Sequence, residues 1–276
     1  MKKIICLILL LVFALAACGE TAPTDKETKP KEEYSYVVVD DYVIYDEYLG
    51  DKENVVIPDK IKGLPVKVIG EYAFAYHEAK SVIIPDTITE IKAKAFVNCP
   101  NLTTVEFGEG LEKIGTGAFQ NCIVLTDVTF PQSLKEIGDN AFYLCEKITE
   151  ITIPKNVENI SSYAFCDTSL TSVVFENGIK QFGGHNAFYS KAEIECVEIP
   201  ASVIHIEDYT FNESLKSVKF LGDAPKYISV PFSEETTIYY NKNANGWDKS
   251  VLRFRDNFIA YWFGGKLWEK SLVVYL

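Results

Sequence analysis

Apolar side chains recur along this chain at an interval of about 23 residues. A phenylalanine returns seven times between residues 74 and 211, with gaps of 22 or 23 residues, and six of the seven follow alanine. These positions are Phe74, Phe96, Phe119, Phe142, Phe165, Phe188 and Phe211. A repeat of this length is typical of a solenoid, in which each unit forms one coil and neighbouring coils share a continuous core.

A second apolar pattern accompanies each phenylalanine and reads apolar-x-x-apolar-x-apolar, as in Leu102, Val105 and Phe107. Its last two apolar positions flank an outward one, which predicts a short strand with the apolar side chains pointing inward. A single unit is too small to enclose a core. Stacked units solve this problem, because like strands then lie about 4.8 Å apart in a parallel ladder and the phenylalanine rings stack inside.

The repeat unit is similar to that of a known family. A representative unit reads CPNLTTVEFGEGLEKIGTGAFQNC, from Cys99 to Cys122. It closely resembles the BspA-like leucine-rich repeat family of bacterial surface proteins, over roughly residues 54–222. The resemblance implies a leucine-rich repeat solenoid with a parallel β-sheet on its concave face, short 3-10 or turn segments on the other face, little α-helix and β-rich caps. It also implies adhesion to host or neighbouring-cell proteins.

We expect the chain to divide into five parts. They are a lipoprotein signal peptide at residues 1–17, a lipidated cysteine and flexible tether at 18–33, an N-terminal β cap at 34–58, about seven 23-residue repeats at 59–222, and a C-terminal cap and tail at 223–276. Residues 259–276 are expected to cover the open end of the solenoid, because an exposed terminal strand invites aggregation. A partner-binding patch is the alternative for this tail.

The N-terminus carries an export signal. Lys2 and Lys3 precede an unbroken apolar run from Ile4 to Ala17, which falls short of the roughly 20 residues that span a bilayer. The run ends in LAAC at Cys18, which resembles the lipobox of bacterial lipoproteins and so implies cleavage before Cys18 and acylation of that cysteine. An ordinary signal peptide with an incidental cysteine is the alternative. We therefore expect an exported protein, lipid-anchored at the outer surface of a bacterial cell envelope, with the membrane as a partner through this lipid.

Composition, net charge and missing motifs argue against several classes of function. The chain has 276 residues, 47% of them apolar, and its 39 acidic against 27 basic residues give a net charge of −12. Loss of Lys2 and Lys3 with the signal peptide leaves 25 basic residues and a charge of −14. Strong acidity argues against nucleic acid as a partner, since phosphate binding needs a basic surface. Only three histidines are present, and neither a G-x-S-x-G nor a P-loop motif occurs, which favours a protein that is not an enzyme and holds no cofactor.

Five cysteines follow Cys18, namely Cys99, Cys122, Cys145, Cys166 and Cys196. The first three stand three residues after a repeat phenylalanine, where the first unit has His77. Stacked coils would bring these groups together, so a metal-binding column is one interpretation. We favour the other, a buried ladder of small apolar residues, because free cysteine packs well as a hydrophobe and no CxxC or HExxH spacing occurs. Neighbouring coils carry parallel side chains, a poor geometry for disulfides, so we expect free thiols and no metal site.

Outward positions of the strand ladder form the candidate binding surface. They are Lys80, Thr103, Glu106, Thr126, Thr129, Thr149, Thr152, Thr171, Glu195, Glu198, Lys216 and Lys219. Threonine stands at the same position in four successive units, which indicates a hydrogen-bonding stripe on the concave face, where repeat proteins commonly bind partners. The alternative is structural, because threonine suits strands and a threonine beside a threonine is a favourable cross-strand pair.

Two functions remain open. The first is a cell-surface, lipid-anchored and non-enzymatic binding module, a monomer that contacts an unidentified host or envelope protein or glycan for adhesion or envelope interaction. The second is a structural or envelope-assembly lipoprotein with no diffusible ligand. A lipobox, a tether and a repeat array without a catalytic constellation favour the first, although a fold does not by itself imply a function.

Overall fold

The computed structural model describes residues 33–182, 184–207, 210–211, 214–228, 236–241, 243–245, 251–254, 257–262 and 273–275, which belong to one unit, Glu32–Leu276. The predicted signal peptide, Cys18 and the tether up to residue 32 lie outside the described residues. Within these ranges the secondary structure consists of strands and turns. The same ranges include no helix that is long and apolar enough to cross a membrane.

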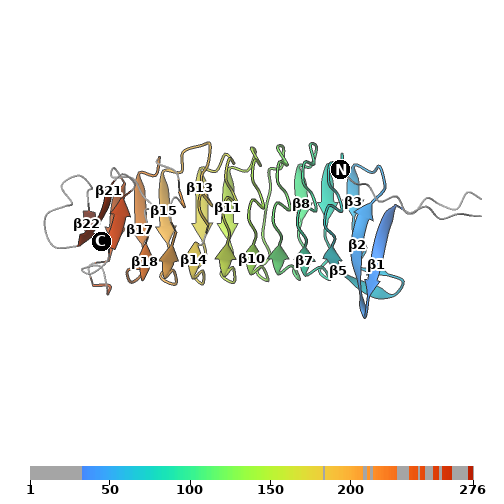
Figure 1. The fold of residues 1–276 in the computed structure, drawn as a ribbon, viewed down its shortest axis with the longest axis horizontal. Helices are drawn as coiled ribbons and strands as arrows, with labels where there is room; N and C mark the ends of the chain where they lie inside the picture. The colour runs from blue at the N-terminus through green and yellow to red at the C-terminus, as the bar shows by residue number, and fades with distance from the viewer. Residues whose placement is uncertain are drawn as a thin grey trace, which may run out of the picture. The chain divides into compact units, whose positions relative to one another are not determined.

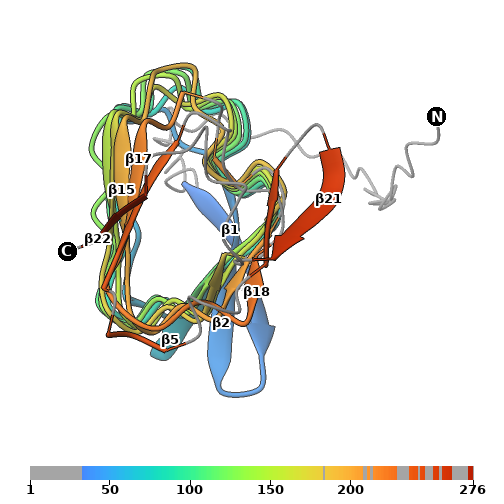
Figure 2. The ribbon, with the colours of Figure 1, turned by 90° about the vertical axis from the view of Figure 1, so that its left-hand side faces the viewer.

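Each repeat unit forms one coil, and one side of the coils carries the longer strands (Figures 1 and 2). We call this side the strand face. Its strands are β3 (Asn54–Val56), β6 (Ser81–Ile83), β8 (Thr104–Glu106), β11 (Glu150–Ile153), β13 (Ser172–Phe175), β15 (Cys196–Ile199), β17 (Ser217–Phe220), β19 (Thr237–Tyr240) and β22 (Val273–Tyr275). Paired strands run parallel, so that the buried Val55, Val82 and Val105 are successive Cα partners. Inward side chains are buried and outward ones are exposed or half-buried, as the alternating pattern predicts.

A second side, the short-strand side, carries mostly two-residue strands. They are β5 (Leu64–Ile69), β7 (Glu90–Ile91), β9 (Lys113–Ile114), β10 (Glu136–Ile137), β12 (Asn159–Ile160), β14 (Gln181–Phe182), β16 (His205–Ile206) and β18 (Tyr227–Ile228). Ile91, Ile114 and Ile137 are successive Cα partners in this parallel sheet and are fully buried. Because strands on both sides impose the same spacing, the coils from β3 to β17 stack in a nearly straight row (Figure 1).

The third side of each coil is a turn that holds the repeat phenylalanine. Successive rings stack with centroids from 4.8 Å (Phe74 and Phe96) to 5.6 Å (Phe188 and Phe211) apart, and their planes differ by 16° or less. In the N-terminal cap, Tyr45 stacks on Phe74 at 5.6 Å and continues the column. The predicted spine of phenylalanines is therefore confirmed.

A third ladder of hydrogen bonds runs along this turn side. The N–H of Phe96, for example, donates to the carbonyl of Ala118 in the next coil at 2.7 Å. The residue two positions before the phenylalanine has a left-handed backbone, with φ of 56° at Lys94 and 62° at Gly117. This conformation costs a non-glycine residue about 1–2 kcal/mol, and the ladder offsets that cost. The repeat pattern does not predict it, because lysine has no preference for left-handed backbone.

The ladder on the strand face is interrupted between β8 and β11. Residues 127–130 occupy the strand position of their coil, yet they form one isolated bridge, between Thr104 and Asp127, and are not assigned as a strand. Among the described backbone hydrogen bonds, none joins residues 127–130 to β11. A second interruption separates β13 from β15. The strand face therefore consists of three shorter sheets, a division that the regular apolar spacing does not predict.

Strands also form both caps. At the N-terminal end, β1 (Tyr34–Val39) and β2 (Tyr42–Tyr48) pair as an antiparallel hairpin, β2 pairs in parallel with β5, and β4 (Lys60–Ile61) pairs with β5 in the antiparallel sense. At the C-terminal end, β20 (Val251–Phe254) and β21 (Asn257–Trp262) form a second hairpin, and β22 pairs in parallel with β19. Of the predicted tail, residues 263–272 and 276 lie outside the described residues.

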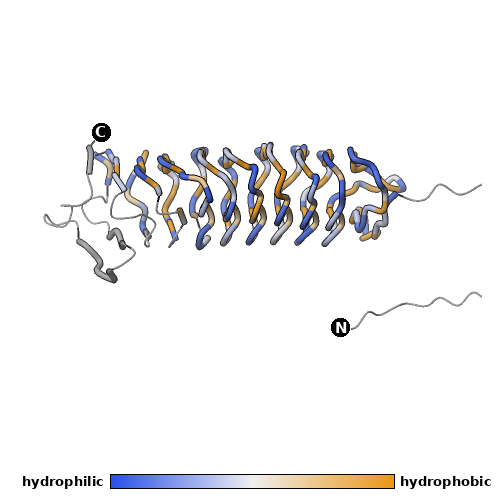
Figure 3. The backbone as a smooth tube through the Cα atoms, turned by 90° about the horizontal axis from the view of Figure 1, so that it is seen from above, coloured by the Kyte–Doolittle hydropathy of each residue, from blue (hydrophilic) through white to orange (hydrophobic). Residues whose placement is uncertain are grey.

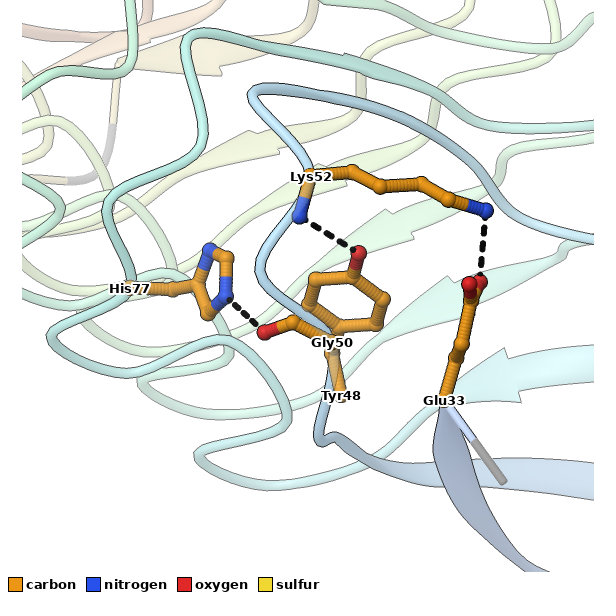
Figure 4. A network of polar contacts seen from close by, with 5 residues as sticks. All are labelled: Glu33, Tyr48, Gly50, Lys52 and His77. Carbon is orange, nitrogen blue, oxygen red and sulfur yellow. Dashed lines mark hydrogen bonds and ion pairs between the residues drawn. The ribbon is translucent and has the colours of Figure 1, made fainter. Parts of the chain in front are cut away.

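Polar contacts join the N-terminal cap to the first coil (Figure 4). Nδ1 of His77 accepts the N–H of Ala79 at 3.0 Å, and Nε2 lies 3.0 Å from the carbonyl oxygen of Gly50. Because a carbonyl oxygen can only accept, Nε2 carries the ring proton. Lys52, two residues after Gly50, forms an ion pair with Glu33 at 2.8 Å. His77 thus ties the repeat array to its cap.

One continuous core runs through the array. It extends from Val43 in β2 to Tyr240 in β19 and contains every repeat phenylalanine. Figure 3 shows apolar and polar stretches alternating along each coil, which is how a chain of small units lines one shared interior. The predicted solenoid of stacked parallel strands is confirmed.

Candidate functional site

The structure places all twelve predicted binding residues on the strand face. One row precedes the strands and consists of Lys80, Thr103, Thr126, Thr149, Thr171, Glu195 and Lys216. A second row continues the strand positions and consists of Glu106, Thr129, Thr152, Glu198 and Lys219. All of these are exposed except Lys219, which is half-buried.

An outward row between these two was missed in the sequence analysis. It contains Ser81, Thr104, Asp127, Glu150 and Ser172, of which Ser81 pairs with Thr104 and Glu150 with Ser172. The period-two alternation of the strands could have identified this row, since each of these residues directly precedes an inward one.

Three of the threonines use their hydroxyl protons inside the protein. The hydroxyl of Thr103 donates to the carbonyl of Lys80 at 2.9 Å, and that of Thr126 donates to the carbonyl of Thr103 at 3.2 Å. Thr171 donates to the carbonyl of Thr149 at 3.3 Å. These hydroxyls tie one coil to the previous coil, which supports the structural interpretation of the stripe, and they offer lone pairs but no proton to a ligand.

Charged residues at the two ends of the strand face are paired. Near the N-terminal end, Lys80 contacts Glu53 at 2.9 Å. Near the C-terminal end, Lys219 contacts Glu198 at 2.7 Å, and Lys216 forms an ion pair with Glu195. Exposed pairs of this kind contribute little to stability, because water screens the charges. They nevertheless leave little net charge at either end of the face.

The centre of the strand face is hollowed where the ladder is interrupted. A hollow of about 450 Å³ lies over the coils that contain residues 128–132, 150–154 and 172–176. Its polar lining includes Thr129, Gln132, Glu150, Thr152, Ser172 and Glu176. The structure therefore brings together two predicted residues, Thr129 and Thr152, with carboxylates that the sequence analysis does not single out.

Glu176 is held in a defined position at this hollow. The side-chain amide of Gln132 lies 3.2 Å from each carboxylate oxygen, and the N–H of Lys155 donates to Oε2 at 3.0 Å. The carbonyl of Gln132 in turn accepts from the Asn156 amide at 2.7 Å. Contacts from neighbouring coils therefore hold the Glu176 carboxylate in place before a ligand binds. Less conformational entropy is then lost on binding than if the side chain had to be ordered at that point.

Two other hollows lie elsewhere on the coils. One of about 620 Å³ on the short-strand side is lined by lysines and glutamates together, and its Lys135 already pairs with Glu112 at 2.9 Å. Another of about 460 Å³ lies beside Ile83 and Glu106. Neither brings several predicted residues together, so the central hollow of the strand face is the candidate site.

The cysteine column has a structural role. Cys99, Cys122 and Cys145 are buried, and each thiol donates to the carbonyl of a phenylalanine in an earlier coil at 3.0 or 3.1 Å. Later coils replace the thiol by a buried hydroxyl, as in Thr168 and Ser190, which donate to backbone carbonyls at 2.8 Å. A small buried donor at this position of the coil, rather than a reactive thiol, is what the fold requires.

Burial also suppresses the chemistry of the Cys145 and Cys166 thiols. It raises the pKa of Cys145 and raises the pKa of Cys166 to about 11, so both stay protonated near neutral pH. Metal binding needs thiolates. In the part of the chain that the structure describes, no group of three or more metal-binding side chains forms, and all five cysteines there are free.

Comparisons with known proteins agree with this geometry. A family model described as the BspA type leucine rich repeat region matches residues 67–186 and 184–238 in six copies. A leucine rich cell surface protein from Faecalibacterium prausnitzii A2-165 superposes with a TM-score of 0.60 at 21% identity, covering 82% of this chain and 75% of that one. A leucine-rich repeat protein from T. pallidum gives 0.51 at 24% identity, covering 82% and 90%. At such identities these two structures show a shared fold. A comparison with curated proteins found no significant match.

Proposed function

The chain belongs to the BspA-type leucine-rich repeat family, and from this premise we propose that it is an exported, non-enzymatic binding module of a bacterial cell surface. The fold of the family is generally a non-catalytic binding scaffold, and one structural relative is described as a cell surface protein. The ligand is a protein or a glycan, and the contact serves adhesion or envelope interaction.

One observation carries the proposal. The strand face presents equivalent outward positions from every coil on one side, and a hollow at its centre joins Thr129 and Thr152. Such a surface is rigid, because the ladders on the short-strand and turn sides and the phenylalanine spine continue beneath the hollow. A rigid, preorganised surface loses little entropy when it binds a partner.

Blocking the hollow tests this proposal. The double variant Thr129→Arg/Thr152→Arg fills it with two long side chains, while Thr116→Arg places the same side chain on an exposed turn away from it. Whole chains are applied to an array of extracellular matrix proteins, envelope proteins and glycans. We expect the double variant to lose capture of the ligand by about tenfold or more, and Thr116→Arg to bind as the parent does. Equal capture by all three chains would place the binding site elsewhere.

The second candidate function is a structural or envelope-assembly lipoprotein without a diffusible ligand. The internal hydroxyl bonds of Thr103, Thr126 and Thr171 and the paired charges at both ends favour it, since these groups stabilise the coils themselves. An array that yields no ligand, combined with crosslinking to a fixed envelope neighbour, would support this function over the first.

Anchoring through Cys18 is part of the proposal. The motif LAAC ends an apolar run at this cysteine, and two or three acyl chains hold a protein on a bilayer much more firmly than one. We expect Cys18→Ala to move the protein from the membrane fraction to the soluble fraction and to abolish incorporation of labelled fatty acid. Unchanged labelling would contradict the lipid anchor while leaving the binding function open.

A further inference from the structure

Hydrogen-bond acceptors outnumber donors at the centre of the strand face. The hydroxyl protons of Thr103, Thr126 and Thr171 point to carbonyls of neighbouring coils, and the Gln132 amide is bonded to Glu176. In the lining of the hollow, the hydroxyls of Thr129, Thr152 and Ser172 can donate or accept, whereas the carboxylates of Glu150 and Glu176 only accept. A partner that suits this surface must supply donors.

The charged side chains at outward positions of the central strand face all have the same sign. Glu106, Asp127, Glu150 and Glu176 stand on these coils, and no lysine or arginine occupies an outward position from β8 to β13. Within the described residues, none of the four carboxylates forms an ion pair. This contrasts with both ends of the face, where each lysine is matched by a glutamate, so a cationic partner is attracted to the centre.

The volume and the lining of the hollow limit which partner can fit. Its volume of about 450 Å³ is enough for one or two side chains and lies within the usual range for ligand pockets. Val174 offers an apolar wall that is 52% exposed, but the one aromatic ring in the lining, Phe130, is only 6% exposed. A sugar ring therefore has no exposed aromatic face to stack on in this hollow.

We propose that the central strand face binds an extended, basic polypeptide segment that places a lysine or arginine side chain in the hollow lined by Glu150 and Glu176. Lysine and arginine side chains carry donors and no acceptor, which complements this surface. Their aliphatic stems pack on Val174 while their charged ends reach the carboxylates. The inference rests on the proposed binding function and assigns its ligand class.

Three labelled peptides of equal length test the assignment by fluorescence anisotropy with the whole chain in detergent. One alternates arginine with threonine, one replaces arginine by the neutral isostere citrulline, and one replaces it by glutamate. We expect binding of the arginine peptide alone, weakening as salt rises. Glu150→Gln and Asp127→Asn should each weaken it by about three- to fivefold, the range of one exposed charge pair. Glu112→Gln, on the short-strand side and paired with Lys135 at 2.9 Å, is the control and should change affinity by less than about twofold.

Several results would overturn the assignment. Equal binding of the citrulline peptide would remove the role of charge, and unchanged affinity in Glu150→Gln and Asp127→Asn would remove the role of the central coils. Binding of cationic chitosan oligomers in place of the arginine peptide would make the ligand a glycan. If no peptide binds while the array finds a ligand that Thr129→Arg/Thr152→Arg abolishes, this inference fails and the proposed function stands. If neither experiment finds a ligand, both fail.

Discussion

At the scale of single residues, each position of the coil has one structural role, which recurs about every 23 residues. Phenylalanine fills the interior and stacks on its neighbours. A small donor, such as Cys122, Cys145 or Thr168, bonds to a backbone carbonyl, and Cys145 shares the Phe119 carbonyl with the N–H of Cys122. His77 takes the same position in the first coil but reaches the cap, because a longer side chain with two nitrogens can join two segments. Different residues can therefore occupy the same coil position when their side chains can fill the same structural role.

Buried thiols make stability depend on alkaline pH. Burial raises the pKa of Cys166 to about 11, whereas an unfolded cysteine ionises near pH 8.5. The thiol is neutral in both states below about pH 8.5, and only the unfolded state gains from ionisation above it. We therefore expect the free energy of unfolding to fall by up to roughly 3 kcal/mol from this thiol between about pH 8.5 and pH 11.

Urea unfolding at a series of pH values measures this effect. Cys166→Ser keeps a small polar side chain that does not titrate in this range, so its decline should be shallower than that of the parent. Cys196→Ser is the control, because Cys196 is exposed and its replacement should leave the slope unchanged. Parallel curves for the parent and Cys166→Ser would disprove the prediction.

At the scale of elements, three ladders of backbone hydrogen bonds join each coil to the next. Strands supply two of them, and the turn side supplies the third through residues such as Lys94 and Gly117 with left-handed backbones. Where one ladder is interrupted, as between β8 and β11, the other two continue: β9 still pairs with β10, and Phe119 still stacks on Phe142. A hollow can therefore open on the strand face without dividing the solenoid.

The turn ladder makes opposite predictions for two equivalent positions. Gly117→Ala puts a methyl group on a backbone with φ of 62° and within 3.0 Å of the Gln120 side chain, so it should destabilise the protein by about 1 kcal/mol or more. Lys94→Gly relieves the same strain in the preceding coil, where φ is 56°, and should cost little or stabilise slightly. Thermal unfolding of both variants measures the difference. A loss of stability in Lys94→Gly as large as in Gly117→Ala would argue against left-handed strain at this turn.

At the scale of the whole molecule, the solenoid needs protection at both ends. The N-terminal end has the hairpin β1–β2 and the contacts of His77, and the C-terminal end has β22 beside β19. Paired charges near the ends and unpaired carboxylates in the centre divide the strand face into neutral and acidic parts. The outward side chains of the central coils therefore form the acidic part of this face.

Removing residues 259–276 tests the C-terminal cap. The deletion takes β22 away from β19 and exposes a strand edge at the end of the ladder. We expect a melting temperature lower by several degrees and association that increases with protein concentration, measured by calorimetry and light scattering. An unchanged melting temperature together with an unchanged monomeric state would show that the tail does not serve as a cap, and would favour a partner-binding patch.

Much of the site followed from the repeat register, and part of it did not. Thr129 and Thr152 were predicted on the strand face because they occupy the same coil position as Glu106. Glu150 precedes an inward residue and could have been found by the same rule. Glu176 could not, because its place at the hollow depends on contacts with Gln132 and Lys155 from other coils. The sequence also does not predict the ion pairs at the two ends of the strand face, because each pair depends on the distance between side chains of neighbouring coils.

The repeat alone predicts the solenoid, its strand positions and its phenylalanine spine, because a unit of about 23 residues has no core except the one it shares with its neighbours. Tertiary structure alone decided where the strand ladder is interrupted, which carboxylates remain unpaired and where the turns adopt left-handed backbone. These features depend on distances between coils rather than on the residues within one coil. The register is a local property of the chain, whereas the hollow is formed only when several coils are stacked.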